Sequence, residues 1–155
     1  MSLTAASLGM EWRSFPELSS ELLYELLRFR QAIFVVEQHS PYADLDGHDQ
    51  GAFHLLLRVE GTLAGCLRLI PGKGEVAIGR VAVAPKWRRC GFAGLMMRES
   101  LARCRRDWSR NRVVLGAQAY LVPFYRGFGF ATVSAPYDDA GVPHVDMALP
   151  PRDAP

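Results

Sequence analysis

Small and basic residues gather in one short stretch that could bind a phosphate group. The stretch is residues 88–94, R-R-C-G-F-A-G, and it follows the apolar, alternating segment 81–84 and Pro85. Backbone N–H groups at a helix start have no partner inside the helix, and small residues let an anion approach them closely. The sequence therefore predicts a phosphate turn here, formed by the residues Arg88, Arg89, Cys90, Gly91, Phe92, Ala93 and Gly94. The alternative is a turn that only caps the helix.

A second group of side chains could transfer protons. Tyr125 offers a phenol, and His54 and His144 offer imidazoles whose ordinary pKa lies near neutrality. Glu37 begins an acidic loop, residues 37–51, that also contains Asp44, Asp46 and Asp49. This loop is either a solvated connection or a segment that lines a pocket and binds a cationic or amine substrate. Its carboxylate spacing lacks the calcium-loop pattern, so we predict no metal.

Composition limits the class of protein. The chain has 155 residues, 49% of them hydrophobic and 22% charged, which suits one globular domain with a core. We expect this domain to span residues 10–149, between flexible termini at 1–9 and 150–155. No apolar run approaches the roughly 20 residues that span a membrane. Because the N-terminal residues lack a basic region followed by an apolar segment, we expect no signal peptide. Three scattered cysteines indicate reduced thiols, so we expect a cytoplasmic protein.

The order of predicted elements places these residues. A strand over 10–15 precedes an amphipathic helix that begins at Ser19 or Ser20 and ends near Val36. Three antiparallel strands follow, at 53–59, 62–70 and 75–84. In the third, the buried alternation changes phase between Ile78 and Val81. One extra residue at Gly79–Arg80, a β-bulge, would repair it; burial of the strand on both faces is the alternative.

The second half of the chain predicts a helix over 92–108 and a strand over 113–117, parallel because a helix precedes it. A short helix over 121–126 and strands over 130–134 and 142–149 complete the order. The first of these helices ends in an arginine cluster, Arg103–Arg112. A solvated helix end explains this cluster. A nucleic-acid surface is the alternative, which the net charge of +2 does not favour.

The combined motifs resemble the GCN5-related N-acetyltransferase (GNAT) superfamily. The phosphate turn matches that family's Q/R-x-x-G-x-G/A signature, and F-Y-R-G-F-G-F follows about thirty residues later. The segments R-Q-A-I-F-V-V-E-Q, P-Y-A-D-L-D-G-H-D and G-V-P-H-V-D-M are similar to the ElaA-like subfamily. The resemblance implies an α/β (α+β) fold: a mixed, mostly antiparallel, splayed sheet of six to seven strands, flanked by about four helices. It also implies acetyl-coenzyme A as donor.

The resemblance also implies roles for single residues. Tyr125 matches the family's general acid, and Gln118 stands where many members have an Asn that bonds the pantetheine arm. The backbone of Val81, Ala82 and Val83 would hold that arm. Glu37 and His144 are equal candidates for the base, with His54 behind them. Candidate substrate-binding residues are Glu37, Asp46, His54, Arg80 and His144, although Arg80 could instead form an ion pair that holds the acidic loop.

These observations predict an acetyl-coenzyme A-dependent N-acetyltransferase. The acceptor would be a primary amine of a small molecule, peptide or protein, and the acidic loop favours a cationic one. A non-catalytic acyl-coenzyme A-binding regulatory domain is the first alternative. A nucleic-acid-binding protein is the second. A homodimer is compatible with the sequence, and no membrane partner is expected.

Overall fold

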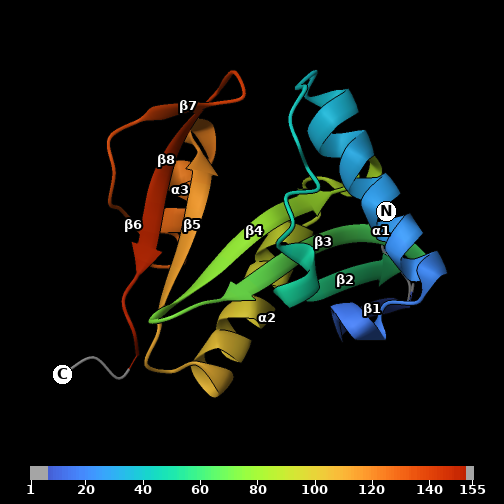
Figure 1. The fold of residues 1–155 in the computed structure, drawn as a ribbon, viewed down its shortest axis with the longest axis horizontal. Helices are drawn as coiled ribbons and strands as arrows, with labels where there is room; N and C mark the ends of the chain where they lie inside the picture. The colour runs from blue at the N-terminus through green and yellow to red at the C-terminus, as the bar shows by residue number, and fades with distance from the viewer. Residues whose placement is uncertain (1–6, 153–155) are drawn as a thin grey trace.

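The computed structural model describes residues 7–152, and the first and last few residues lie outside this range. One open sheet with helices on both faces forms the fold (Figure 1). Its strand order is β1-β2-β3-β4-β5-β8-β6, and β7 pairs with β8. The strands are β1 (Leu8–Ser14), β2 (Phe53–Val59), β3 (Thr62–Pro71), β4 (Glu75–Val83), β5 (Arg112–Gln118), β6 (Ala131–Thr132), β7 (Tyr137–Asp139) and β8 (Val142–Leu149).

The helices divide between the two faces of the sheet. They are α1 (Ser20–Arg30), continued by a π-helix (Gln31–Glu37), then α2 (Phe92–Asp107) and α3 (Val122–Arg126). Leu56 packs under α1, whereas Leu55 and Leu57 face the core that includes α2. β2 is therefore buried on both faces, which explains the three consecutive leucines at its centre, residues 55–57. The predicted fold class, a mixed and mostly antiparallel sheet between helices, is confirmed.

Most predicted boundaries agree with the structure, and three need correction. β1 begins at Leu8, because Leu8 and Gly9 pair with Val59 and Arg58 although we expected them in a flexible lead-in. The first helix becomes a π-helix at Gln31, which apolar spacing does not reveal. β7 lies between the strands expected over 130–134 and 142–149, where no strand was predicted, and its exposed residues pair with β8. Ser19 caps α1 as predicted, accepting a hydrogen bond from the Leu22 N–H at 3.1 Å.

The predicted bulge lies in β4. Cys66 pairs with Ala82 while Arg68 pairs with Gly79, so β4 has one extra residue against β3. Arg80 takes a positive φ of 53°, as bulges allow. Beyond Ala77, β4 also loses its parallel partner β5. The bulge and the loss of pairing together splay the sheet, and the separated ends of β4 and β5 leave room for a ligand.

A buried network of ions fixes the acidic loop to the sheet. Arg30, 1% exposed, bonds Asp44 at 3.0 Å and Asp49 at 2.7 Å. Arg68 bonds Asp49 at 2.9 Å and also pairs with Asp46. Burial alone would raise the pKa of Asp49, but the hydrogen bonds and charges of Arg30 and Arg68 outweigh it and hold that pKa below its ordinary range. The carboxylates of the loop therefore form ion pairs that hold the loop against α1 and β3.

Replacing Arg30 should destabilise the protein strongly. Arg30→Met would leave Asp44 and Asp49 buried with fewer partners, so we expect a loss of about 3 kcal/mol in the free energy of unfolding. Urea unfolding would measure it. Arg28→Met is the matched control, because Arg28 lies exposed on the same helix. Equal stability of the two variants would contradict a stabilising role for the network.

The same network predicts acid sensitivity. The lowered pKa of Asp49 means that its stabilisation is complete above the ordinary value of 3.8 and is lost as the pH falls below it. Wild-type stability should therefore drop as the pH falls below about 4, and less so in Asp49→Asn. Parallel curves for the two proteins would show that Asp49 is not responsible.

The arginine cluster at the end of α2 is largely engaged within the protein. The Arg103 guanidinium lies 4.7 Å from the Trp12 ring centroid and 4.4 Å from that of Phe53. It also pairs with Asp107 at 3.2 Å, and Arg112 pairs with Glu75 at 2.8 Å. These contacts support the structural interpretation of the cluster. No helix within residues 7–152 is long and apolar enough to cross a membrane.

Candidate active site

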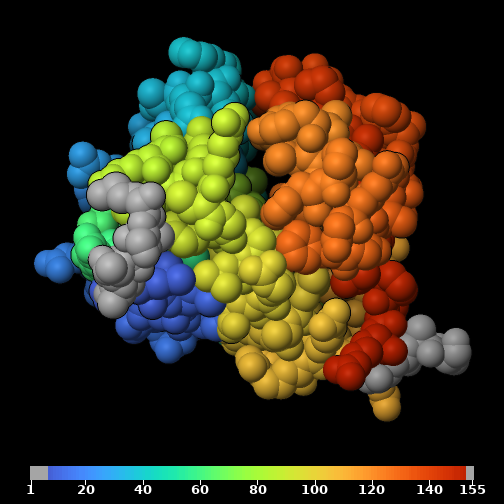
Figure 2. All heavy atoms as spheres, turned by 180° about the vertical axis from the view of Figure 1, so that it is seen from behind, coloured from blue at the N-terminus to red at the C-terminus, as the bar shows by residue number. Residues whose placement is uncertain are grey.

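The separated ends of β4 and β5 line the larger cavity, of about 660 Å³. From behind, the molecule is hollowed between the residues near 80–95 and those near 120–130 (Figure 2). The end of the π-helix and the β7–β8 turn form other walls. The cavity brings together these predicted site residues: Glu37, Arg80, Val81, Ala82, Val83, Arg88, Arg89, Gln118, Tyr125 and His144.

The phosphate turn lies between β4 and α2 as predicted. Arg89 and Gly91 both take positive φ values, 62° and 81°, and Gly91 is the N-cap of α2. No acceptor within residues 7–152 bonds the backbone N–H groups from Arg89 to Gly94, and the first helical bond from this turn runs from Leu95 N–H to Gly91 O. A row of free donors at a helix start fits a pyrophosphate. Cys90 is exposed beside them, and its thiol contacts the Arg88 carbonyl.

β4 offers backbone groups to the same cavity. Ile78 to Val83 have no strand partner on the β5 side within the described residues. An extended ligand can add to such an edge as a strand would. One acceptor is already used, because Arg88 Nε donates to Val83 O at 3.0 Å. The backbone at Val81 and Ala82 is therefore the part of this edge along which an extended ligand could add.

Tyr125 presents a phenol to the cavity. Its side chain is 6% exposed and packs against the rings of Phe124 and Phe130. The hydroxyl has no hydrogen-bond partner within the described residues. Burial raises the pKa of Tyr125 to about 12, with a smaller contribution from Tyr120, so the phenol stays protonated near neutrality. A buried phenol with a free hydroxyl facing a cavity can donate a proton to a bound group.

Known proteins are similar to this chain in sequence and in fold. A family model described as "Acetyltransferase (GNAT) domain" matches residues 19–150. The chain belongs to the GNAT acetyltransferase family. Protein ElaA of Escherichia coli is 38% identical over 146 residues, which cover 90% of this chain and 95% of ElaA.

Solved structures agree with this GNAT assignment. The crystal structure of Escherichia coli ElaA matches with a TM-score of 0.87 and 37% identity, covering 92% of this chain and 99% of that one. An acyl-CoA N-acyltransferase from Pseudomonas aeruginosa matches with a TM-score of 0.86 and 35% identity over the same shares of the two chains. The resemblance that the sequence motifs indicated is therefore confirmed, including its ElaA-like character.

Of the two base candidates in this GNAT cavity, Glu37 is held by an arginine. Arg88 donates through both terminal nitrogens to the Glu37 carboxylate, and one of these bonds measures 2.7 Å. The hydrogen bond from Arg88 holds the pKa of Glu37 below its ordinary range. A carboxylate that is already paired and less basic is a poor proton acceptor.

His144 has the better geometry for a base. Its Nδ1 lies 2.7 Å from the Val142 carbonyl, which can only accept, so the proton of the neutral ring belongs on Nδ1. Nε2 then carries the lone pair. No partner of Nε2 occurs within residues 7–152, and His144 lines the cavity. A neutral imidazole with its second nitrogen free can accept a proton from an incoming amine.

Three other predicted residues have structural partners. Arg80 lies 2.8 Å from Asp44 and 3.2 Å from Asp46, so the interpretation as an ion pair that holds the acidic loop is the one the contacts favour. Asp46 pairs with Arg68 as well and does not line the cavity. His54 is 1% exposed, and its Nε2 contacts Asp49 O at 3.0 Å. Burial lowers the pKa of His54, and it too lies away from the cavity.

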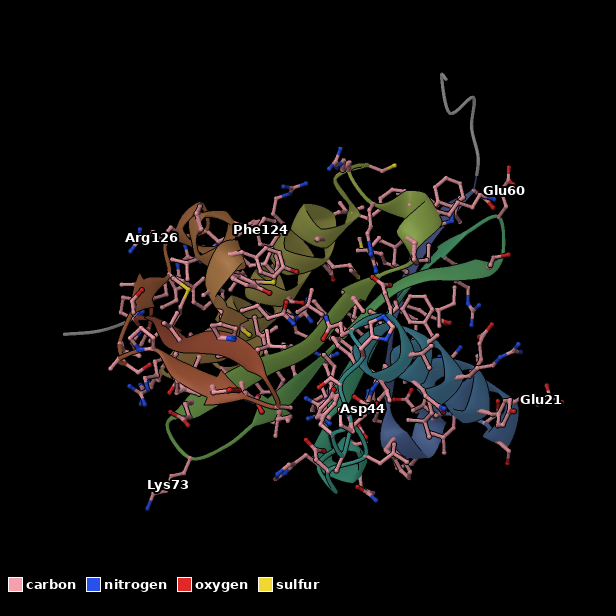
Figure 3. The ribbon with its side chains drawn as sticks, turned by 90° about the horizontal axis from the view of Figure 1, so that it is seen from above. Glu21, Asp44, Glu60, Lys73, Phe124 and Arg126 are labelled. Carbon is pink, nitrogen blue, oxygen red and sulfur yellow. The ribbon has the colours of Figure 1, made fainter. Side chains whose placement is uncertain are left out.

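The acidic loop thus does not form the binding site for a cationic substrate that its composition favoured. Asp44 lies on the loop beside the central strands (Figure 3) and is buried against Arg30 and Arg80. Asp49, which shares Arg30 with Asp44, is likewise buried. Three arginines neutralise the carboxylates of the loop: Arg30, Arg68 and Arg80. Asp139 in β7 instead puts a carboxylate without an ion-pair partner, among the described residues, on the cavity wall. No three His, Cys, Asp or Glu side chains within residues 7–152 are grouped to hold a metal.

Sequence reasoning missed the side chains that bridge the cavity mouth. Gln38 Oε1 lies 3.5 Å from Gln118 Nε2, and Ser40 Oγ donates to Ala140 O at 3.2 Å. Tyr137 stacks on His144. The first two pairs are 80 and 100 residues apart in sequence, so no local pattern could reveal them. The third depends on β7, whose exposed residues show no alternation.

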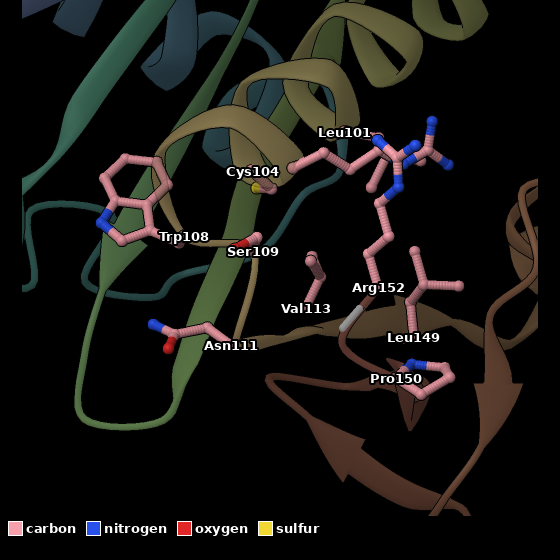
Figure 4. A pocket seen from close by; sticks show the side chains of 10 residues that line it. Leu101, Cys104, Trp108, Ser109, Asn111, Val113, Leu149, Pro150 and Arg152 are labelled. Carbon is pink, nitrogen blue, oxygen red and sulfur yellow. The ribbon is translucent and has the colours of Figure 1, made fainter. Parts of the chain in front are cut away.

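A second, smaller pocket of about 140 Å³ lies at the far end of α2. Leu101 and Cys104 of α2, Val113 of β5 and the segment Leu149–Arg152 surround it (Figure 4). Burial raises the pKa of the Cys104 thiol to about 11, which leaves it unreactive near neutrality. No predicted site residue lines this pocket.

Proposed function

We propose that this protein is an acetyl-coenzyme A-dependent N-acetyltransferase that acts on a primary amine. The observation that carries the proposal is the Tyr125 hydroxyl, without a partner among the described residues, in a cavity that is also lined by the open edge of β4 and by Arg88 and Arg89 of the phosphate turn. The rest of that turn, residues 90–94, follows directly but does not line the cavity itself. The GNAT family assignment and the acyl-CoA N-acyltransferase neighbour support an acyl-CoA donor. We propose acetyl as the acyl group because the matching family is described as acetyltransferases.

The N–H groups from Arg89 to Gly94 would bind the pyrophosphate, and Arg89 would add a positive charge beside it. The open edge of β4 would hold the pantetheine arm and polarise the thioester carbonyl through a backbone N–H. This arrangement would orient the thioester toward the acceptor side of the cavity. Gln118, on the end of β5, would contact the arm in the place of the family's Asn.

His144 Nε2 would accept a proton from the substrate ammonium, so that the neutral amine can attack the thioester carbonyl carbon. As the new C–N bond forms and the C–S bond breaks, Tyr125 would give its proton to the leaving thiolate. The second amine proton leaves to solvent, and the phenol is reprotonated from water. The products are an amide and free coenzyme A. Asp139 would attract a cationic acceptor to the wall beside His144.

The direct test is release of free thiol from acetyl-coenzyme A across a panel of primary amines, with donor binding measured by calorimetry. Turnover with at least one amine would support the proposal. Tight donor binding without turnover on any amine would instead support a regulatory acyl-coenzyme A-binding domain. Binding of neither donor nor amine would contradict both functions. Cytoplasmic location and a homodimer stay predictions from the sequence.

Replacing His144 should impair catalysis most where the amine is protonated. For His144→Gln we expect turnover to fall about a hundredfold near pH 7, because a general base typically contributes 10²- to 10⁴-fold. The loss should shrink as the pH approaches the pKa of the amine, where no base is needed. A pH–rate profile on one active amine would measure this.

Glu37→Gln is the matched comparison for the base. It removes a carboxylate of the same cavity that is already paired with Arg88. We expect its pH–rate profile to keep the wild-type shape. A Glu37→Gln profile that loses its acidic limb, beside an unaffected His144→Gln, would move the base to Glu37.

A further inference from the structure

β7, the short strand that sequence analysis did not predict, places an aromatic ring against His144. Tyr137 pairs with His144 across the β7–β8 ladder. The two rings are stacked, with centroids 6.0 Å apart and planes 24° from parallel. Both residues line the larger cavity. The imidazole thus has a flat apolar surface on one side and the acceptor space beside it.

The Tyr137 ring is itself anchored at its far end. Its hydroxyl donates to Asp146 Oδ1 at 2.7 Å. Asp146 follows His144 by two residues in β8, so the two side chains point to the same face of the sheet. The backbone N–H of Asp146 donates to Ser134 Oγ at 2.8 Å, which fixes this part of β8.

Gly116 provides the space that this tyrosine needs. It pairs with Asp146 across β5 and β8, and a Cβ at Gly116 would lie 3.1 Å from the Tyr137 hydroxyl. That distance is tighter than ordinary contact, so a side chain here would displace the phenol. The three residues Gly116, Tyr137 and Asp146 therefore form one arrangement beside His144.

We propose that Tyr137, anchored by Asp146, is a positioning residue that holds His144 in the orientation and tautomer needed for proton removal. The hydrogen bond to Val142 O selects the Nδ1–H tautomer only while the ring stays in its plane, and the stack on Tyr137 keeps it there. Without the stack the ring can turn about its side-chain bonds, and Nε2 leaves the acceptor space. The inference rests on the proposed function of His144.

The test compares Tyr137→Leu with Tyr137→Phe. The four histidines of the chain would be labelled with ¹⁵N, and the His144 signals assigned by their loss in His144→Gln. In the wild type we expect the neutral ring to be mainly the Nδ1–H tautomer. Tyr137→Phe keeps the stacked ring but loses its hydrogen bond to Asp146, so we expect the same tautomer to dominate with a smaller share. In Tyr137→Leu the ¹⁵N shifts should move toward the average of the two tautomers. Tyr24→Leu is the control, because Tyr24 is 71% exposed on α1.

Kinetics give the second readout. In Tyr137→Leu we expect kcat to fall about ten- to a hundredfold through misplacement of the base, while donor affinity stays at the wild-type value. Tyr137→Phe should recover most of this loss. Wild-type ¹⁵N shifts in Tyr137→Leu would overturn the inference, whatever the activity. Wild-type activity of His144→Gln would instead overturn the proposed base, and the tautomer measurement would still decide the positioning role.

Discussion

Gly91→Asp should weaken binding of acetyl-coenzyme A about a hundredfold or more. The new carboxylate would stand at the N-cap of α2, among the free N–H groups of the phosphate turn. A like-charge contact at about 4 Å costs about 1 to 4 kcal/mol, depending on exposure, and a pyrophosphate carries more than one charge. Aspartate tolerates the positive φ of this position better than most residues, so the variant should fold. Isothermal titration with acetyl-coenzyme A would measure the loss.

Two variants separate charge from backbone strain in this experiment. Gly74→Asp adds the same side chain at nearly the same φ, 76° against 81°, in open surroundings. Gly74 follows Lys73 at the tip of the β3–β4 hairpin, which projects away from the body of the molecule (Figure 3). Gly91→Asn adds nearly the same bulk without charge. We expect wild-type binding for the first and an intermediate loss for the second. Wild-type affinity of Gly91→Asp would show that the pyrophosphate binds elsewhere.

Tyr125→Phe should lower turnover about 10²- to 10⁴-fold and leave donor affinity unchanged. The change removes the proton that the thiolate would take, but it keeps the ring that packs against Phe124 and Phe130. Because the hydroxyl has no partner among the described residues, its loss should not lower the melting temperature. Steady-state kinetics, donor titration and thermal unfolding on the same preparation would separate these three effects.

Tyr120 offers the sharpest comparison for Tyr125. Its phenol lines the same cavity but is 72% exposed. Tyr120→Phe should therefore keep turnover within about twofold of the wild type, since an exposed phenol can be replaced by water as a proton donor. If Tyr120→Phe loses turnover while Tyr125→Phe does not, the acid has been assigned to the wrong tyrosine.

The sequence by itself predicted the elements that we propose bind the donor. Gly91 and its neighbours mark the phosphate turn because a helix start with small residues has a local signature. The phase change around Arg80 marks the bulge because alternation along one strand is also local. The family motifs placed Tyr125. Each of these features depends on residues close together in the chain, so the chain order alone reveals them.

Only the tertiary structure decided what the charged residues do. The composition of the acidic loop predicted a site for a cationic substrate. In the structure Arg30 of α1 and Arg68 of β3 form ion pairs with its carboxylates and neutralise their charge. Glu37 and His144 are equal base candidates by sequence. In the structure Arg88 pairs with Glu37, whereas Nε2 of His144 has no partner among the described residues, which favours His144 in the proposed mechanism. No pattern in the sequence indicated a role for Tyr137, because an exposed strand of three residues shows no hydrophobic periodicity. Pairing between distant residues is set by the packing of the whole sheet, and no local pattern records it.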